Sequence, residues 1–163
     1  MDLISLVNLF QDRLFIENKI SRASIVLSGD SGSIVFPVPP SELPTIELVQ
    51  NNTTFSSLSG DITLIGQMGL RTISMDLLLP NDCSKYSFAS GDNADTIINF
   101  ITRERANYNP LRLVITRGNN TYLNMQCVIN KFSYSKDNVG DYKASFEFVE
   151  FRTQNPISGA LES

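Results

Sequence analysis

Alternating apolar and polar residues, interrupted by short turn sequences, restrict the fold of this chain more than any other feature. In residues 71–79, RTISMDLLL, every second residue from Ile73 to Leu79 is apolar. A two-residue period places these side chains on one face of a strand, whereas a helix needs a period of about 3.6. The pattern therefore predicts half-buried β-strands.

Three pairs of strand-like segments flank sequences that favour tight turns, and each pair predicts an antiparallel hairpin. The pairs are residues 24–28 with 33–38 around GDSG, 111–116 with 122–130 around GNN, and 132–136 with 142–151 around DNVGD. Residues 45–50 and 61–66 are also strand-like. With about seven strands and no regular βαβ alternation, we expect a mainly β fold, an antiparallel two-sheet sandwich or barrel.

The apolar positions change parity in the fourth quarter of the chain. They are odd-numbered from Leu123 to Ile129 and even-numbered at Phe132 and Tyr134. Because a two-residue pattern can change parity only through a bulge or bend, we expect an irregularity between these positions.

Residues 93–107 follow helical spacing, with Ala94, Ile97, Ile98 and Ile101 on one stripe. Asp92 or Asn93 is a candidate N-cap, and Asp95 in the first turn complements the helix dipole. Arg103 and Arg105 lie near the C-terminus, and Asn109-Pro110 ends the helix. We expect this helix to pack on one side of the sheet.

The chain divides into three parts. Residues 1–18 form an N-terminal amphipathic helix or arm, because Leu3, Leu6, Val7, Phe10 and Leu14 share one face; it packs on its own domain or docks on a partner. Residues 19–152 form the β domain, in which four prolines between positions 37 and 44 predict an extended connector. Residues 153–163 are expected to be a flexible tail.

The composition excludes several kinds of site. Without histidine there is no Ser-His-Asp triad, Cys-His pair or imidazole metal site. Cys83 and Cys127 cannot build a four-thiolate zinc site, and we expect both to be reduced. A net charge of −4 disfavours nucleic-acid binding, which needs a basic face, and no apolar run approaches the ~20 residues of a membrane span.

Each candidate for chemistry has a simpler interpretation. Asp92 and Asp95 could be paired catalytic carboxylates, but we favour helix-capping residues. Asp137 and Asp141 could belong to a calcium-binding loop, but we favour a hairpin turn. Ser59 lacks the G-x-S-x-G context of a catalytic serine. We therefore expect no catalytic, cofactor-binding or metal-binding residue.

Two other features suggest contacts rather than catalysis. Glu104, between two arginines, belongs to a solvated helix face or touches a partner, and we favour the solvated face. Six aromatic residues near the C-terminus could stack bases, but in an acidic chain core and interface packing explain them better. They are Phe132, Tyr134, Tyr142, Phe146, Phe148 and Phe151.

A series of short motifs between residues 34 and 152 occurs in a familiar order. The motifs are FPVPP at 36–40, LSGDITLIG at 58–66, GLRTIS at 69–74 and GDYKASFEFVEFR at 140–152. This order resembles the N-terminal domain of LysM-type tail and baseplate proteins of contractile phages and related phage-like particles of Gram-positive hosts.

The resemblance implies a fold of the phage tail-tube type with a flanking helix, and sheet edges that join neighbours in a ring. It implies a structural component that joins the tail tube to the central hub and spike and is not an enzyme. The implied partners are further copies in a hexameric ring, the tube protein, the hub and spike, and the wedge proteins. No cofactor, sequence-specific nucleic acid or membrane is implied.

The implied location is the virion tail or a phage-like particle, after synthesis in the bacterial host cytoplasm. This family usually continues through a linker into a LysM module, whereas the sequence here ends at Ser163, so the resemblance is to the domain without that module. Two alternatives remain. One is a carbohydrate- or ligand-binding β-sandwich module with a concave aromatic site, although the chain has no Trp. The other is a small hydrolase that uses a serine or an aspartate pair.

Overall fold

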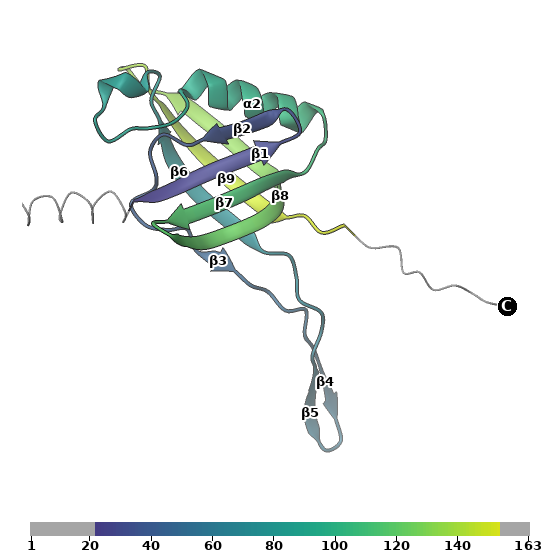
Figure 1. The fold of residues 1–163 in the computed structure, drawn as a ribbon. Coiled ribbons are helices and arrows are strands. Elements are labelled where there is room, and N and C mark those ends of the chain that lie inside the picture. The colour runs from purple at the N-terminus through teal and green to yellow at the C-terminus, as the bar shows by residue number, and fades with distance from the viewer. Residues whose placement is uncertain (1–21, 154–163) are drawn as a thin grey trace, which may run out of the picture.

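The computed structural model describes residues 22–153, and its fold is the expected mainly antiparallel β structure with one flanking helix (Figure 1). The N-terminal helix expected within residues 1–18 lies outside the described residues, as does the expected tail from residue 154 onward. The strands are β1 (Ala23–Gly29), β2 (Gly32–Val35), β3 (Ile46–Glu47), β4 (Thr53–Ser57), β5 (Gly60–Leu64), β6 (Thr72–Leu79), β7 (Leu111–Arg117), β8 (Asn120–Lys136) and β9 (Tyr142–Glu150). A short 3₁₀ turn η1 (Cys83–Lys85) and the helix α2 (Ala94–Ala106) follow β6.

Seven strands form one curved antiparallel sheet in the order β2-β1-β7-β8-β9-β6-β3. Within residues 22–153 the edge strands β2 and β3 do not pair with each other, so the sheet is not a closed barrel. The strands β4 and β5 form a separate two-stranded ribbon. In Figure 1 this ribbon projects from the sheet on the side away from α2.

The three expected hairpins are confirmed as β1–β2, β7–β8 and β8–β9. The strand β8 serves two of them, and its pairing with β9 shifts register between Ile129 and Lys131, where the sequence predicts a bulge. The extra residue turns the side chain of Phe132 back toward the core, against which it packs. The change of parity in the sequence therefore marks a real irregularity of the sheet.

Two strand predictions need correction. The segment expected at residues 45–50 is reduced to Ile46–Glu47 and an isolated bridge between Gln50 and Met68. The strand β5 pairs with Thr53–Ser57, a segment in which the sequence predicts no strand. All residues of β4 and β5 are exposed, so neither strand has the buried face that produces alternation.

The core lies between the curved sheet and α2. It contains alternate residues of the central strands, such as Leu113, Met75 and Phe148, and the helical residues Ile97 and Ile101. Each fully buried aliphatic or aromatic side chain contributes roughly 1.5–3 kcal/mol. A one-residue slip of any central strand would turn its apolar set toward water, and this penalty fixes the register.

The helix α2 begins and ends as expected but is not capped as expected. Asn93 is the N-cap residue, yet its side chain makes no capping bond, and its Oδ1 instead accepts from the Cys83 N–H at 3.0 Å. Asp92 accepts from the Val35 N–H at 2.7 Å. Neither side chain caps the helix, because both bind backbone of other segments. Among residues 22–153, no helix is long and apolar enough to cross a membrane.

Candidate assembly surfaces

Residues 48–70, which we call the finger, leave the sheet after β3 and return to it at β6, with the β4–β5 ribbon at the end (Figure 1). The finger exposes many large apolar side chains. They are Leu48, Val49, Phe55, Leu58, Ile62, Leu64, Ile65, Met68 and Leu70. A two-stranded ribbon is marginally stable alone in water, and a large exposed apolar patch marks an interaction site. The finger is therefore the strongest candidate contact surface in the described part of the chain.

Specific hydrogen bonds order the part of the finger between the ribbon and the sheet. The Asn51 N–H donates to Gln67 at 3.0 Å, and the Gly69 N–H donates to Val49 at 2.7 Å. The Gly66 N–H donates to the Asn52 side chain at 2.9 Å. A Cβ on Gly66 would lie 1.5 Å from the Asn51 carbonyl oxygen, so only glycine fits. The finger thus has a defined conformation within one chain.

The ribbon has one apolar and one polar face. Phe55 is opposite Ile62 in the pairing, and their side chains share a face with Leu64. On the other face Thr54 lies 3.2 Å from Thr63, oxygen to oxygen, and Ser56 donates to Asp61. Asp61 is the one charged residue between positions 48 and 70. The ribbon therefore offers an almost uncharged apolar face to a partner.

A buried carboxylate fastens the base of the finger. Glu150, at the end of β9, accepts from the Arg71 guanidinium at 2.9 Å, the Arg71 N–H at 3.0 Å and Arg152 at 2.7 Å. Arg152 also donates to the Met68 and Gly69 carbonyls at 3.4 and 3.3 Å. Burial alone would raise the pKa of Glu150, but the hydrogen bonds from Arg152 and Arg71 lower it to about 2. This cluster, the clamp, ties the returning chain of the finger to β9.

The sheet has open edges beside the finger. The strand β3 pairs with β6 only at Thr72 and Ile73, so from Ser74 to Leu79 the outer edge of β6 has no strand partner among the described residues. An unpaired strand edge presents backbone donors and acceptors to another chain. The β6 edge is a second candidate contact surface.

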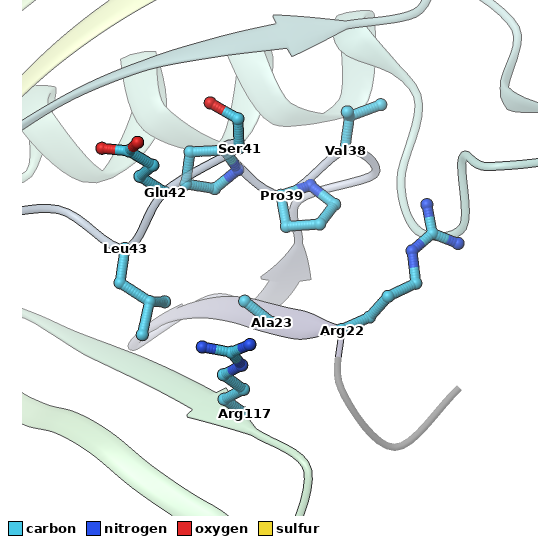
Figure 2. Close-up of a pocket in the computed structure, with 9 residues that line it drawn as sticks. Arg22, Ala23, Val38, Pro39, Ser41, Glu42, Leu43 and Arg117 are labelled. Carbon is cyan, nitrogen blue, oxygen red and sulfur yellow. The ribbon is translucent and has the colours of Figure 1, made fainter. Parts of the chain in front are cut away.

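A pocket of about 550 Å³ lies where the proline-rich connector passes the start of β1 (Figure 2). Its polar lining consists of Arg22, Ser41, Glu42 and Arg117, and its apolar lining is aliphatic and proline, with no aromatic side chain. Arg22 donates to the Phe88 carbonyl. As the sequence predicts, the connector contains neither helix nor strand. The pocket lacks the aromatic surface of a typical sugar-binding site.

The aspartates singled out in the sequence have structural partners. Asp137 accepts from the Val139 and Asp141 N–H groups at 2.9 and 3.0 Å, which confirms the hairpin turn. Asp141 accepts from the Tyr86 hydroxyl and from the Asn81 N–H at 3.0 Å, and these bonds lower its pKa. Among residues 22–153, no group of three or more Cys, Asp and Glu side chains is placed to hold a metal ion.

The favoured interpretation of Glu104 as part of a solvated helix face is wrong. Its side chain is fully buried, and Oε1 accepts from the Ser31 hydroxyl and from the Ser31 N–H at 3.3 Å. Its Oε2 has no hydrogen-bond partner. Glu104 lies three and seven residues after Ile101 and Ile97, and therefore falls on the buried face of α2.

The remaining candidates fit structural roles. Cys83 and Cys127 are free thiols, and burial raises the pKa of Cys127 to about 12. The rings of Phe132 and Phe146 stack with centroids 4.9 Å apart, and those of Phe146 and Phe148 with centroids 5.7 Å apart. Ser59 lies in the turn between β4 and β5. The buried part of the aromatic group is thus core.

The finger and the clamp were not identified by the sequence analysis. A signal for the finger exists: apolar residues recur over 23 positions with one charge, Asp61. No local signal identifies the clamp, because Arg71 and Glu150 are 79 residues apart.

No protein-family model matches the chain. Over 136 residues, or 80% of its length, the chain is 26% identical to YqbP, an uncharacterized protein of Bacillus subtilis (strain 168). It spans 59% of the length of that relative.

Proposed function

We propose that this protein is a structural component of a contractile phage tail or phage-like particle: a ring-forming baseplate or tube-end protein that joins the tail tube to the central hub and spike. It acts through contacts between chains, with copies of itself and with the tube and hub proteins. On this proposal it is not an enzyme, and it is located in the tail of the particle.

The finger is the observation that carries this proposal. It exposes nine large apolar side chains. Within residues 22–153 its β4–β5 ribbon forms a sheet of its own and pairs with no strand of the seven-stranded sheet. Leaving such a surface in water is unfavourable by about 25 cal/mol for each Å² of apolar area. A permanent assembly removes that cost, because a neighbouring chain covers the surface.

Two further features support assembly. The open edge of β6 offers backbone hydrogen bonds to another strand, as a ring of joined sheets would need. The mainly antiparallel β fold with one flanking helix agrees with the tail-tube type that the sequence motifs imply. The pocket in Figure 2 has no aromatic side chain, so this pocket is not the aromatic site that the ligand-binding alternative predicts.

The test compares the full chain with a variant that lacks most of the finger. Gln50 and Met68 already face each other as an antiparallel bridge, so an Asn-Gly turn can replace residues 51–67. Sedimentation and electron microscopy should find ring-shaped assemblies of the full chain, alone or mixed with a tail-tube protein of the same particle, and none of the variant. As a control, the variant should keep the thermal unfolding transition of the full chain, which shows that its sheet is still folded. A full chain that stays monomeric in both settings contradicts the proposal.

A further inference from the structure

A second apolar surface lies at the C-terminal end of α2. Here a pocket of about 290 Å³, which we call the socket, is lined by Arg105, Tyr108, Asn109, Leu111, Val128 and Ile129. Its rim is exposed: Tyr108 is 93% and Val128 38% exposed. The socket is large enough for an aliphatic side chain, and no side chain of its own fills it.

Tyr108 is held in a conformation that an aromatic residue rarely adopts. It follows the C-cap residue Asn107 with a φ of 57°, in the left-handed region where glycine is usual. This conformation is strained for a residue with a Cβ, and the ring gains nothing from packing because it is almost fully exposed. The ring stands unburied beside the socket, where the side chain of a partner can pack against it.

We propose that the finger of one copy of this chain docks in the socket of a second copy. The inference rests on the proposed function and specifies which surfaces meet. Leu58, in the turn at the end of the finger, is fully exposed and would enter the socket between Tyr108 and Val128. The two faces of the ribbon would then lie against opposite sides of the rim, the apolar face with Phe55 and Ile62 toward Val128 and the polar face with Asp61 toward Arg105.

The charges of the two surfaces are complementary. Asp61 is the one charged residue of the finger, three positions from Leu58. Arg105 lies on the socket and, among the described residues, forms no ion pair within its own chain. Docking would bring these opposite charges together at the rim, which favours this partner and this orientation over others.

The placement of the two surfaces requires contact between different copies. In Figure 1 the finger and α2 lie on opposite sides of the sheet, so a chain cannot fill its own socket. Such a contact is head to tail, and a pair of copies would still carry one free finger and one free socket between them. Repetition of this contact produces a closed ring or a stack, which is the form of assembly that the proposed function needs.

Charge reversal tests the contact. Asp61→Arg and Arg105→Asp should each weaken self-association at least about tenfold by sedimentation, and the double variant should restore it. Both residues are exposed, so these variants should fold. Arg103→Asp is the matched control, because Arg103 lies in the same helical turn but lines a different groove, beside β2. Self-association that neither reversal changes overturns the contact.

Disulfide trapping between different chains gives a second readout. On a Cys83→Ser background, one preparation carries Leu58→Cys and another Val128→Cys; the native Cys127 is buried and unreactive. Oxidation should produce a covalent dimer in the mixture and little in either preparation alone. Val139→Cys, exposed in another turn, is the control partner and should give none.

The outcomes separate the two proposals. If the protein assembles but the mixed dimer does not form, or Leu58→Cys alone cross-links finger to finger, the finger–socket contact is wrong and the assembly role stands. If the wild-type chain remains monomeric with and without the tube protein, both proposals fail.

Discussion

Arg71 and Glu150 hold the returning chain of the finger against the end of β9. The Arg71 guanidinium lies 2.9 Å from the Glu150 carboxylate, and the Glu150 N–H donates to the Arg71 carbonyl at 2.8 Å. A side-chain ion pair and backbone bonds thus connect the same two residues. Because Arg71 follows the finger directly, this pair limits the directions in which the finger can project.

The clamp predicts a loss of stability in acid. The pKa of Glu150 is about 2, below its ordinary 4.5, so its contribution is complete above pH 4.5 and is lost as the pH falls toward 2. Arg152 is half exposed and solvent screens its charge, so we expect a contribution on the order of 1–2 kcal/mol. Urea unfolding at pH 7 and pH 3 should show this loss for wild type and a smaller one for Glu150→Gln.

A matched control for the clamp is Glu147→Gln, on the same strand but in no ion pair among the described residues. It should retain the pH dependence of the wild type. Equal pH dependence in wild type and Glu150→Gln would show that the clamp does not contribute.

Substitution of Tyr108 by glycine should affect stability and self-association differently. Tyr108→Gly relieves the strain of a φ of 57° but adds freedom to the unfolded chain, so the free energy of unfolding should be unchanged or rise by up to about 1 kcal/mol. The same variant should weaken self-association, since it removes the exposed ring from the socket. Thermal unfolding and sedimentation measure the two effects. A large loss of stability would mean that Tyr108 supports the fold instead.

Buried positions were the predictable ones. Ile97 and Ile101, and the change of parity between Ile129 and Phe132, could be interpreted because burial imposes a period on the sequence. Glu104 was wrongly assigned to the solvated face because it is charged, although its position in the helix places it on the buried face.

Exposed and long-range features were less predictable. The strand at Thr53–Ser57 has no buried face, so its sequence has no alternation to detect. The clamp depends on two strands meeting in the sheet, and no local pattern records such a meeting. The sequence feature that marks the finger is instead its length of 23 residues with one charged residue.

Substitutions of Glu104 and Gly29 should have non-additive effects on the free energy of unfolding. Glu104→Ala leaves a cavity and the Ser31 N–H without its acceptor, and should cost about 2–3 kcal/mol of unfolding free energy. A Cβ on Gly29 would lie 2.6 Å from Glu104 Oε2, so Gly29→Ala should also destabilise. In the Glu104→Ala background, Gly29→Ala should cost less, although Leu111 remains close. Additive unfolding energies in urea would contradict this contact.

Gly66 predicts that the finger can be disrupted while the sheet stays folded. In Gly66→Ala the new Cβ would lie 1.5 Å from the Asn51 carbonyl oxygen, so the two strands of the finger must separate there. Since the core contains no finger residue, the thermal transition of the sheet should change little. Hydrogen exchange should instead speed up at the Asn51 and Gly69 amides, and self-association should fall. Ser59→Ala, in the exposed turn of the ribbon, is the control and should alter neither quantity. If Gly66→Ala abolished the folding transition of the whole domain, the finger would be part of the folding unit rather than an extension of it.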